Sequence, residues 1–240
     1  MCIRDRPSYT VILDWLEDEL RGGGLSVGDK LPGERALAER FGISRTSVRE
    51  ATRMLDAMGL LRASAGSGPN AGTILVSQPS AALAWALRMH IATRALPMAD
   101  VVTTRVLLET DAARAAARAA QGADDAARAA ALDDAEALVD RMDDEALPAE
   151  QFHRLDAEFH VLLASLARNV VVETVMSSLR EATIGYVQET VALLDDWRDV
   201  RAGLQRDHRA VLAHVRARDG DAAADALRSH ILGFYSLAVR

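Results

Sequence analysis

The chain has 240 residues, half of them apolar and only 4% aromatic, with a heavy load of alanine. This composition favours helical packing and leaves enough apolar side chains for one or two cores. The net charge of −7 falls entirely after residue 77, because residues 1–77 carry ten basic and ten acidic side chains. The acidic remainder is a poor nucleic-acid surface, so any DNA contact should belong to the first part of the chain.

Cysteine content and hydropathy indicate where the protein resides. The single cysteine, Cys2, allows no intrachain disulfide and fits a reducing cytosol. No apolar run approaches the roughly eighteen residues that span a bilayer, and no signal peptide is visible. We therefore expect a cytoplasmic protein that does not bind a membrane. Residues 1–7 show no interpretable pattern.

The first predicted helix covers residues 9–21, with Ser8 as its N-cap and three glycines after its end. A connector over residues 25–30 follows. We expect Val27 within it, and Leu31 just after it, to pack against the next two helices.

Residues 31–58 predict two short helices joined by a tight turn. Glu34 opens the first helix, where a negative charge is favoured. Gly42 suits the left-handed residue at its end, and Ser44 offers an N-cap oxygen to the second helix. This arrangement is typical of a helix-turn-helix whose second helix reads DNA.

The second of these helices has an apolar stripe and, opposite it, arginines four residues apart: Arg45, Arg49 and Arg53. These arginines could form a solvated face, with Arg49 and Arg53 paired to Glu50 or Asp56. Crowded hydroxyls and a guanidinium at the helix start favour DNA binding instead. The residues concerned are Ser44, Arg45, Thr46 and Ser47.

Two short β-prone runs, at residues 60–61 and 73–76, flank a glycine-rich segment and predict a β-hairpin. Glycines at its tip, Gly66 to Gly68, would let the backbone approach a DNA groove, or would form a plain flexible turn. We therefore predict a winged helix-turn-helix domain over residues 8–77. A hinge around Pro79 should follow it.

Residues 81–239 predict six or seven helices and no strand. Proline, glycine and asparagine mark the breaks between them. The expected helices cover residues 81–95, 98–120, 124–143, 148–167, 170–194, 196–218 and 221–239, with Asp221 capping the last. Helices of this length predict an antiparallel bundle, so the fold class is mainly α with one small hairpin.

Three histidines and an aspartate fall on apolar faces of these helices. Asp156 and His160 are four residues apart and share one face, and His208 and His230 lie in two later helices. Such groups need partners, and this set suits a divalent metal such as zinc. Each histidine could instead be a hydrogen-bonded core residue, and His153 could replace His160.

The segment from Leu31 to Leu61 resembles the winged-helix domain of the GntR family of bacterial repressors. It contains Leu-Pro-x-Glu-Arg, then Ser-Arg-x-x-Val-Arg-Glu-Ala, then Gly-Leu before a glycine-rich wing that is longer than the shortest wings of the family. The resemblance implies that the principal DNA contacts are Arg35, Arg45 and Arg49. It places Ser44, Thr46 and Ser47 near phosphates and Gly66 at the minor groove.

The second half resembles the all-helical FCD domain of the FadR subfamily of GntR regulators. It has Arg-x-x-x-Glu in an early helix, Asp-x-x-Phe-His followed by an asparagine, and one histidine in each of the last two helices. In metal-binding members the aspartate and the three histidines hold a divalent metal. By resemblance the ligands of zinc, or else of nickel or manganese, are Asp156, His160, His208 and His230.

The same resemblance implies an effector site, because the family's effectors are commonly small organic acids. The guanidinium of Arg105 could form a bidentate hydrogen bond with the effector's carboxylate beside the metal. Alternatively, Arg105 could form an ion pair with Glu109 on an exposed face of the helix. Asn169 could be a second polar contact, or the turn residue between two helices.

The resemblance covers residues 9–237 and implies a homodimeric transcription regulator, most often a repressor, that binds a pseudo-palindromic operator in double-stranded DNA. A small organic acid bound near the metal in the helical domain, residues 81–239, would modulate operator affinity. Two alternatives remain: a metal-dependent hydrolytic enzyme with an appended DNA-binding domain, and a regulator whose metal is purely structural. Because no general base is evident apart from the ligands, we do not expect an enzyme.

Overall fold

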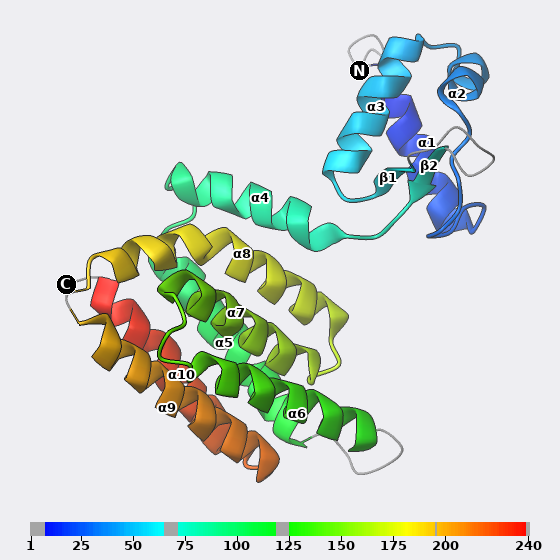
Figure 1. Ribbon diagram of the computed structural model, residues 1–240. Helices are drawn as coiled ribbons and strands as arrows, with labels where there is room; N and C mark the ends of the chain where they lie inside the picture. Colours follow the sequence, from blue (N-terminus) through cyan, green and yellow to red (C-terminus); the bar gives the residue numbers. More distant parts are fainter. Residues whose placement is uncertain (1–7, 65–71, 119–124, 195, 239–240) are drawn as a thin grey trace. The chain divides into compact units, whose positions relative to one another are not determined.

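The computed structural model describes residues 8–64, 72–118, 125–194 and 196–238 (Figure 1). The chain divides between residues 83 and 84 into two compact units. Helices dominate, and the described strands form one two-stranded antiparallel sheet, which confirms the predicted fold class. Among the described helices, none combines the length and apolarity that crossing a membrane requires.

The first unit is a three-helix domain with a β-hairpin. Leu61 pairs with Leu75 and Ser64 with Gly72 across the hairpin, and Lys30 bridges to Ile74 beside it. Apolar side chains from the three helices and both strands form the core. The elements are α1 (Thr10–Gly22), α2 (Glu34–Phe41), α3 (Arg45–Ala57), β1 (Leu61–Ser64) and β2 (Gly72–Leu75).

The helix-turn-helix forms as predicted. Gly42 ends α2 with φ of 61°, a left-handed conformation that glycine adopts without steric cost. Ser44 caps α3, since its Oγ accepts a hydrogen bond from the Ser47 backbone N–H at 3.0 Å.

Two predictions near α1 are wrong. Tyr9 occupies the N-cap position of α1 and provides no side-chain cap, so Ser8 does not cap this helix. Val27 is 63% exposed and does not pack on the helix-turn-helix, whereas Leu31 is buried in the core as expected.

The second unit is a bundle, and the described residues after Leu75 contain no strand, as predicted. The helix α10 packs against both α5 and α9, while α7 lies between α6 and α8 and also contacts α5 (Figure 1). Helix α4 spans the division between the units. The helices are α4 (Pro79–Ala92), α5 (Met98–Arg118), α6 (Asp125–Met142), α7 (Ala149–Ser165), α8 (Val170–Ala192), α9 (Trp197–Arg216) and α10 (Gly220–Ala238).

Two local predictions in this half need correction. Pro79 is not part of a non-helical hinge but is the first residue of α4, where its missing N–H costs nothing. Asp221 lies inside α10, and the cap comes from Asp219, whose carboxylate accepts a hydrogen bond from the Ala222 backbone N–H at 3.0 Å.

Candidate metal centre and nucleic-acid interface

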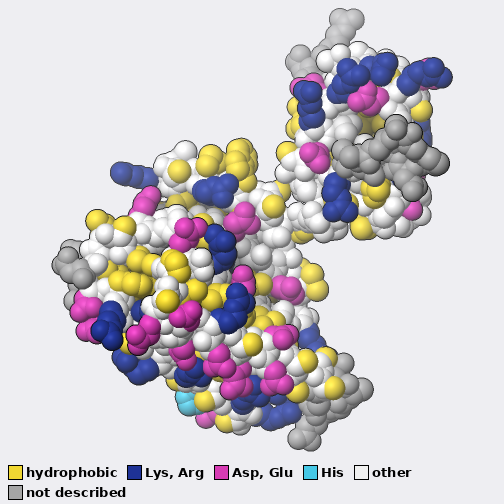
Figure 2. All heavy atoms as spheres, viewed as in Figure 1, with side chains coloured by type: hydrophobic (Ala, Val, Ile, Leu, Met, Phe, Trp, Pro, Cys, Tyr) yellow, Lys and Arg dark blue, Asp and Glu magenta, His cyan; other side chains and the backbone are white. Residues whose placement is uncertain are grey.

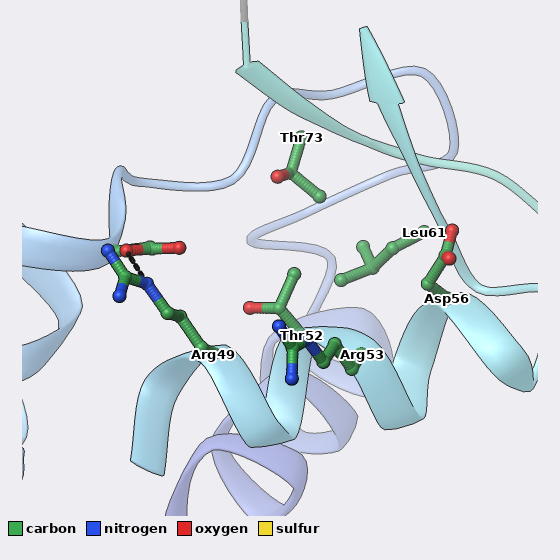
Figure 3. Close-up of a pocket in the computed structure, with 7 residues that line it drawn as sticks. Arg49, Thr52, Arg53, Asp56, Leu61 and Thr73 are labelled. Carbon is green, nitrogen blue, oxygen red and sulfur yellow. Dashed lines mark hydrogen bonds and ion pairs between the residues drawn. The ribbon is translucent and has the colours of Figure 1, made fainter. Parts of the chain in front are cut away.

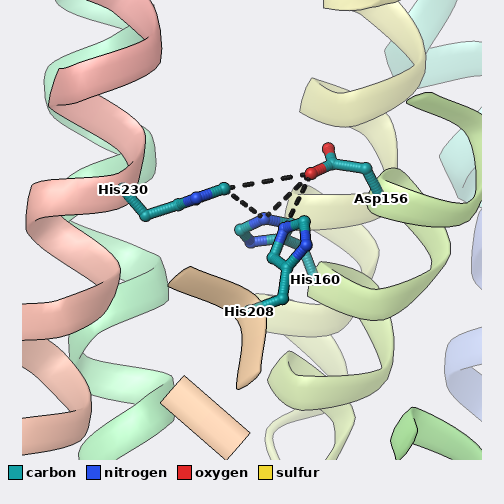
Figure 4. Close-up of side chains that lie close together, drawn as sticks. All are labelled: Asp156, His160, His208 and His230. Atoms are coloured by element: carbon teal, nitrogen blue, oxygen red, sulfur yellow. Dashed lines mark hydrogen bonds and ion pairs between the residues drawn. The ribbon is translucent and has the colours of Figure 1, made fainter. Parts of the chain in front are cut away.

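Four side chains from three helices converge inside the second unit (Figure 4). Asp156 and His160 lie one turn apart on α7, His208 comes from α9 and His230 from α10. One potential ligand atom from each residue lies within 4.8 Å of all the others. None of the four residues is more than 8% exposed. The tertiary fold thus brings together the residues predicted as metal ligands.

The spacing of the atoms in this cluster suits coordination. Asp156 Oδ1 lies 2.9 Å from His208 Nε2, 3.6 Å from His160 Nε2 and 3.8 Å from His230 Nε2. The Nε2 atoms of His160 and His230 are 3.2 Å apart. Metal–ligand bonds of about 2.0–2.2 Å separate neighbouring ligand atoms by roughly 2.9–3.5 Å. The donors therefore need only small shifts to bind one ion.

Unpaired nitrogen atoms support this fit. Both ring nitrogens of His208 are buried without a hydrogen bond, although Nε2 lies close to Asp156. His160 Nδ1 lies 2.5 Å from Glu109 Oε2, while its Nε2 faces the cluster, 3.2 Å from His230 Nε2. A divalent cation would give the nitrogen atoms that face the cluster a partner, so the residues present fit a bound metal.

Glu109 on α5 is the centre of a buried charge network around the cluster. Besides His160, its carboxylate accepts hydrogen bonds from Arg105 Nε at 2.9 Å and from Arg180 Nη2 at 3.3 Å. Arg180 on α8 also donates through Nη1 to Asp156 Oδ2 at 2.9 Å. The pairing of Arg105 with Glu109 is therefore correct, but it lies in the core and not on an exposed face.

The network sets the charge of the cluster. Burial tends to raise the pKa of Asp156, but Arg180 and His160 outweigh it and hold that pKa well below its usual value. Burial also opposes ionisation of Glu109, but its cationic neighbours, led by Arg180, hold its pKa well below the usual value. Burial lowers the pKa of His208 and of His230. Carboxylates that stay ionised and imidazoles that stay neutral are the forms that bind a metal.

A cavity of about 30 Å³ adjoins the cluster. Its polar lining includes two guanidinium groups, and Arg180 Nε and His153 Nε2 are buried there without a hydrogen-bond partner. This volume holds about one water molecule. The lining residues are Arg105, His153, Asp156, Arg180, Val187, Leu204, His230, Ile231 and Phe234.

Two sequence interpretations change at this site. Asn169 is exposed at the start of α8, where its Oδ1 accepts hydrogen bonds from the backbone N–H groups of Val171 and Val172. It is thus a capping turn residue that does not line the cavity beside the cluster, and its contact with an effector stays a prediction. His153 lies outside the four-residue cluster and packs its ring against Trp197 instead.

Two residues of the site, Arg180 and Asp207, were not predicted from the sequence. Arg180 carries no local signal, because no partner of its guanidinium lies within one or two helical turns in the sequence. The partners Asp156 and Glu109 are 24 and 71 residues away. Asp207, whose Oδ2 lies 3.4 Å from His230 Nδ1, could have been found only from its place beside His208.

The predicted DNA contacts lie at one end of the first unit. Basic side chains gather there, where α2 meets the start of α3 (Figure 2). Three arginines and two hydroxyl residues are exposed, Ser47 is half-buried, and Gly66 lies outside the described residues. The exposed residues are Arg35, Ser44, Arg45, Thr46 and Arg49.

The partner of Arg49 differs from the one considered in the sequence. Its Nε donates to Glu34 Oε2 on α2 at 2.9 Å, and not to Glu50 on its own helix. Both residues border a pocket of about 290 Å³ between α3 and the hairpin (Figure 3). The remaining lining residues are Thr52, Arg53, Asp56, Leu61 and Thr73.

Comparisons with known proteins agree with both halves of this description. The family described as "Bacterial regulatory proteins, gntR family" matches residues 8–69, and the FCD domain family matches residues 100–233. The solved structure of Streptococcus agalactiae GntR shares the fold, with a TM-score of 0.63, 24% identity, and coverage of 95% of this chain and 98% of that one.

Three relatives match most of the chain. The Uxu operon regulator of Haemophilus influenzae is 29% identical over 231 residues, 93% of this chain and 79% of the relative. The transcriptional regulator LutR of Bacillus subtilis is 28% identical over 88% of this chain and 92% of its own length. The transcriptional repressor NanR of Citrobacter rodentium is 30% identical over 90% of this chain and 79% of its own. These relatives are transcription regulators and not enzymes, and this chain belongs to the GntR family of DNA-binding transcription regulators, with a helix-turn-helix domain followed by an FCD domain.

Proposed function

We propose that this regulator is a homodimeric repressor whose affinity for a pseudo-palindromic operator depends on a small organic acid bound beside a divalent metal in the FCD domain. The observation that carries the proposal is the buried Asp/His cluster with a two-arginine cavity next to it. Repression is the proposed direction because the relative NanR is named a repressor. Two-fold symmetry of a dimer would match two operator half-sites.

Zinc is the proposed metal, with nickel or manganese as alternatives, since three imidazoles and one carboxylate suit borderline divalent ions. Asp156 would bind through Oδ1, because Arg180 holds Oδ2. Glu109 would orient the ring of His160 from the opposite side. When bound, the metal supplies a Lewis acid that attracts an anionic ligand.

Arg105 and Arg180 would receive the carboxylate of the effector. Both are buried at the cavity, and a guanidinium binds a carboxylate through two parallel N–H donors. An organic acid is larger than a cavity of about 30 Å³, so its binding has to displace lining side chains. For the effector to regulate DNA binding, its affinity would have to differ between two arrangements of the protein.

Metal analysis combined with operator binding tests this proposal. The full chain is assayed for metal before and after chelation, and for operator affinity with a panel of short mono-, di- and hydroxycarboxylates. We expect about one metal ion per chain, and at least one acid that weakens operator binding only while the metal is present.

Two results would contradict the proposal. A protein that purifies and folds without any divalent metal would remove the metal from it. A metal-loaded protein whose operator affinity responds to no acid, but which loses stability on chelation, would indicate that the metal is purely structural.

A further inference from the structure

The carboxylate of Glu34 lies between two of the arginines predicted to contact DNA. Glu34 is the first residue of α2, and its Oε2 accepts a hydrogen bond from Arg49 Nε on α3 at 2.9 Å (dashed line in Figure 3). The same oxygen lies 3.6 Å from Arg45 Nη2, one turn earlier on α3. A single acidic oxygen therefore contacts both guanidinium groups at the start of the recognition helix.

These pairs contribute little to folding. The side chains of Glu34, Arg49 and Arg45 are 38%, 53% and 59% exposed, and ion pairs in contact with water add little to stability. The arrangement is thus accessible to DNA. The main effect of these ion pairs is therefore on the orientation of the Arg45 and Arg49 side chains toward DNA.

Contact through Nε leaves the outer edge of Arg49 free to read a base. A guanidinium recognises guanine by donating two parallel hydrogen bonds to O6 and N7. With Nε held by Glu34, the two terminal nitrogens of Arg49 remain available as such a pair. Holding a long side chain in one orientation also reduces the conformational entropy that is lost on binding.

The charge of Glu34 acts differently on specific and non-specific DNA. Non-specific binding depends on neutralising phosphates, and a carboxylate beside Arg45 and Arg49 reduces the positive charge available for that purpose. On the operator, base contacts made by the oriented guanidinium groups offset this loss.

We propose that Glu34 is a positioning and specificity-determining residue, which orients Arg49 and Arg45 toward base edges and weakens their attraction to phosphates alone. The inference concerns the first unit only and does not depend on the metal or on the effector.

The test compares Glu34→Gln with Glu17→Gln in the full chain. Glu17 makes an exposed ion pair with Arg21 on α1, so Glu17→Gln changes the net charge equally but leaves the recognition helix untouched. A duplex selected by the wild-type protein from a randomised library serves as the specific site, and a scrambled duplex of the same composition serves as the non-specific site. Affinities for both are measured over a series of salt concentrations.

Glu34→Gln should bind the scrambled duplex more tightly, with a salt slope steeper by up to about one unit. The ratio of specific to non-specific affinity should fall by about tenfold, whereas Glu17→Gln should leave it within about twofold. Glu34→Asp, whose shorter side chain retracts the carboxylate, should also lower the ratio without a change in charge. Thermal melting verifies that each variant is folded.

Arg49→Lys provides a second test. Lysine has one charged nitrogen and no fork, so Glu34→Gln should change the ratio much less in an Arg49→Lys background than in the wild type. Two results overturn the proposal: a ratio for Glu34→Gln equal to that of the wild type, or an equal fall for Glu17→Gln.

Discussion

Asp156 has different neighbours at its two carboxylate oxygens. Oδ2 accepts a hydrogen bond from Arg180, while Oδ1 faces the Nε2 atoms of three histidines. This division leaves one oxygen for a metal and keeps the buried carboxylate ionised. The balance depends on residues that touch the ligands and not on the ligands alone.

Glu109→Gln should weaken metal binding by about ten- to a hundredfold, because His160 would lose the carboxylate that orients its ring. Competition with a chromophoric chelator gives the dissociation constant. Glu150→Gln, which removes an exposed carboxylate paired with Arg154 on α7, is the matched control and should bind metal normally. Equal metal affinities for Glu109→Gln and the wild type would show that Glu109 does not support the site.

The buried side chain of His153 should make the free energy of unfolding depend on pH. Burial lowers its pKa below the ordinary value of about 6.5, so the unfolded chain binds more protons than the folded one below that pH. Its contribution to stability is therefore fully present above about pH 6.5 and is lost as the pH falls toward the folded-state pKa. The slope contributed by one such histidine is at most about 1.4 kcal/mol per pH unit.

His153→Phe should flatten this dependence, since Phe fits the ring contacts with Phe152 and Trp197 and takes up no proton. Denaturant unfolding of both metal-free proteins between about pH 7.5 and 5 measures the difference. Parallel curves for the two proteins would mean that His153 is already protonated in the folded state or is not responsible for the slope.

At the scale of elements, the packing of α10 against α5 depends on small residues. Ala113, Ala116 and Ala117 of α5 are fully buried, and Gly220 at the start of α10 lies directly over this helix. A Cβ atom at Gly220 would meet the backbone of Arg114 at 3.1 Å. The close approach positions α10, which in turn carries His230 to the cluster.

Gly220→Ala should therefore destabilise the protein by about 1 kcal/mol or more, because backbone atoms cannot move aside as a flexible side chain can. Gly233→Ala is the control in the same helix. Nothing lies within 4 Å of a Cβ there, so helix propensity should make that change neutral or stabilising by up to about 1 kcal/mol. Denaturant unfolding distinguishes the two, and equal effects would contradict the close approach.

At the scale of the whole molecule, the chain consists of two units with separate cores. All four proposed ligands belong to the second unit, and the helix-turn-helix belongs to the first. A metal should therefore stabilise only the second unit, by mass action on its folded state.

Hydrogen exchange measured by mass spectrometry tests this division. Chelation should reduce protection in α5, α7, α9 and α10 and leave α1 to α3 unchanged. His208→Ala combined with His230→Ala should reproduce the pattern without a chelator. Equal loss of protection in both units would show that the metal supports the fold of the whole chain.

By itself, the sequence determined the elements and much of the chemistry. Apolar periodicity and helix breakers located every described helix of the second unit to within a few residues, and the turn from Gly42 to Ser44 located the helix-turn-helix. These signals are local, because the direction of a side chain about its own helix axis depends only on spacing. For the same reason Asp156 and His160 could be assigned to one face of one helix.

The tertiary structure alone decided which faces meet. Spacing could not show that His208 and His230 reach Asp156, that Arg180 approaches from α8, or that Arg49 pairs with Glu34. It also left Asn169 with two interpretations, of which the structure supports the helix cap. Contacts between distant segments depend on how helices pack against one another. That packing is a property of the complete core, and no single stretch of the sequence contains it.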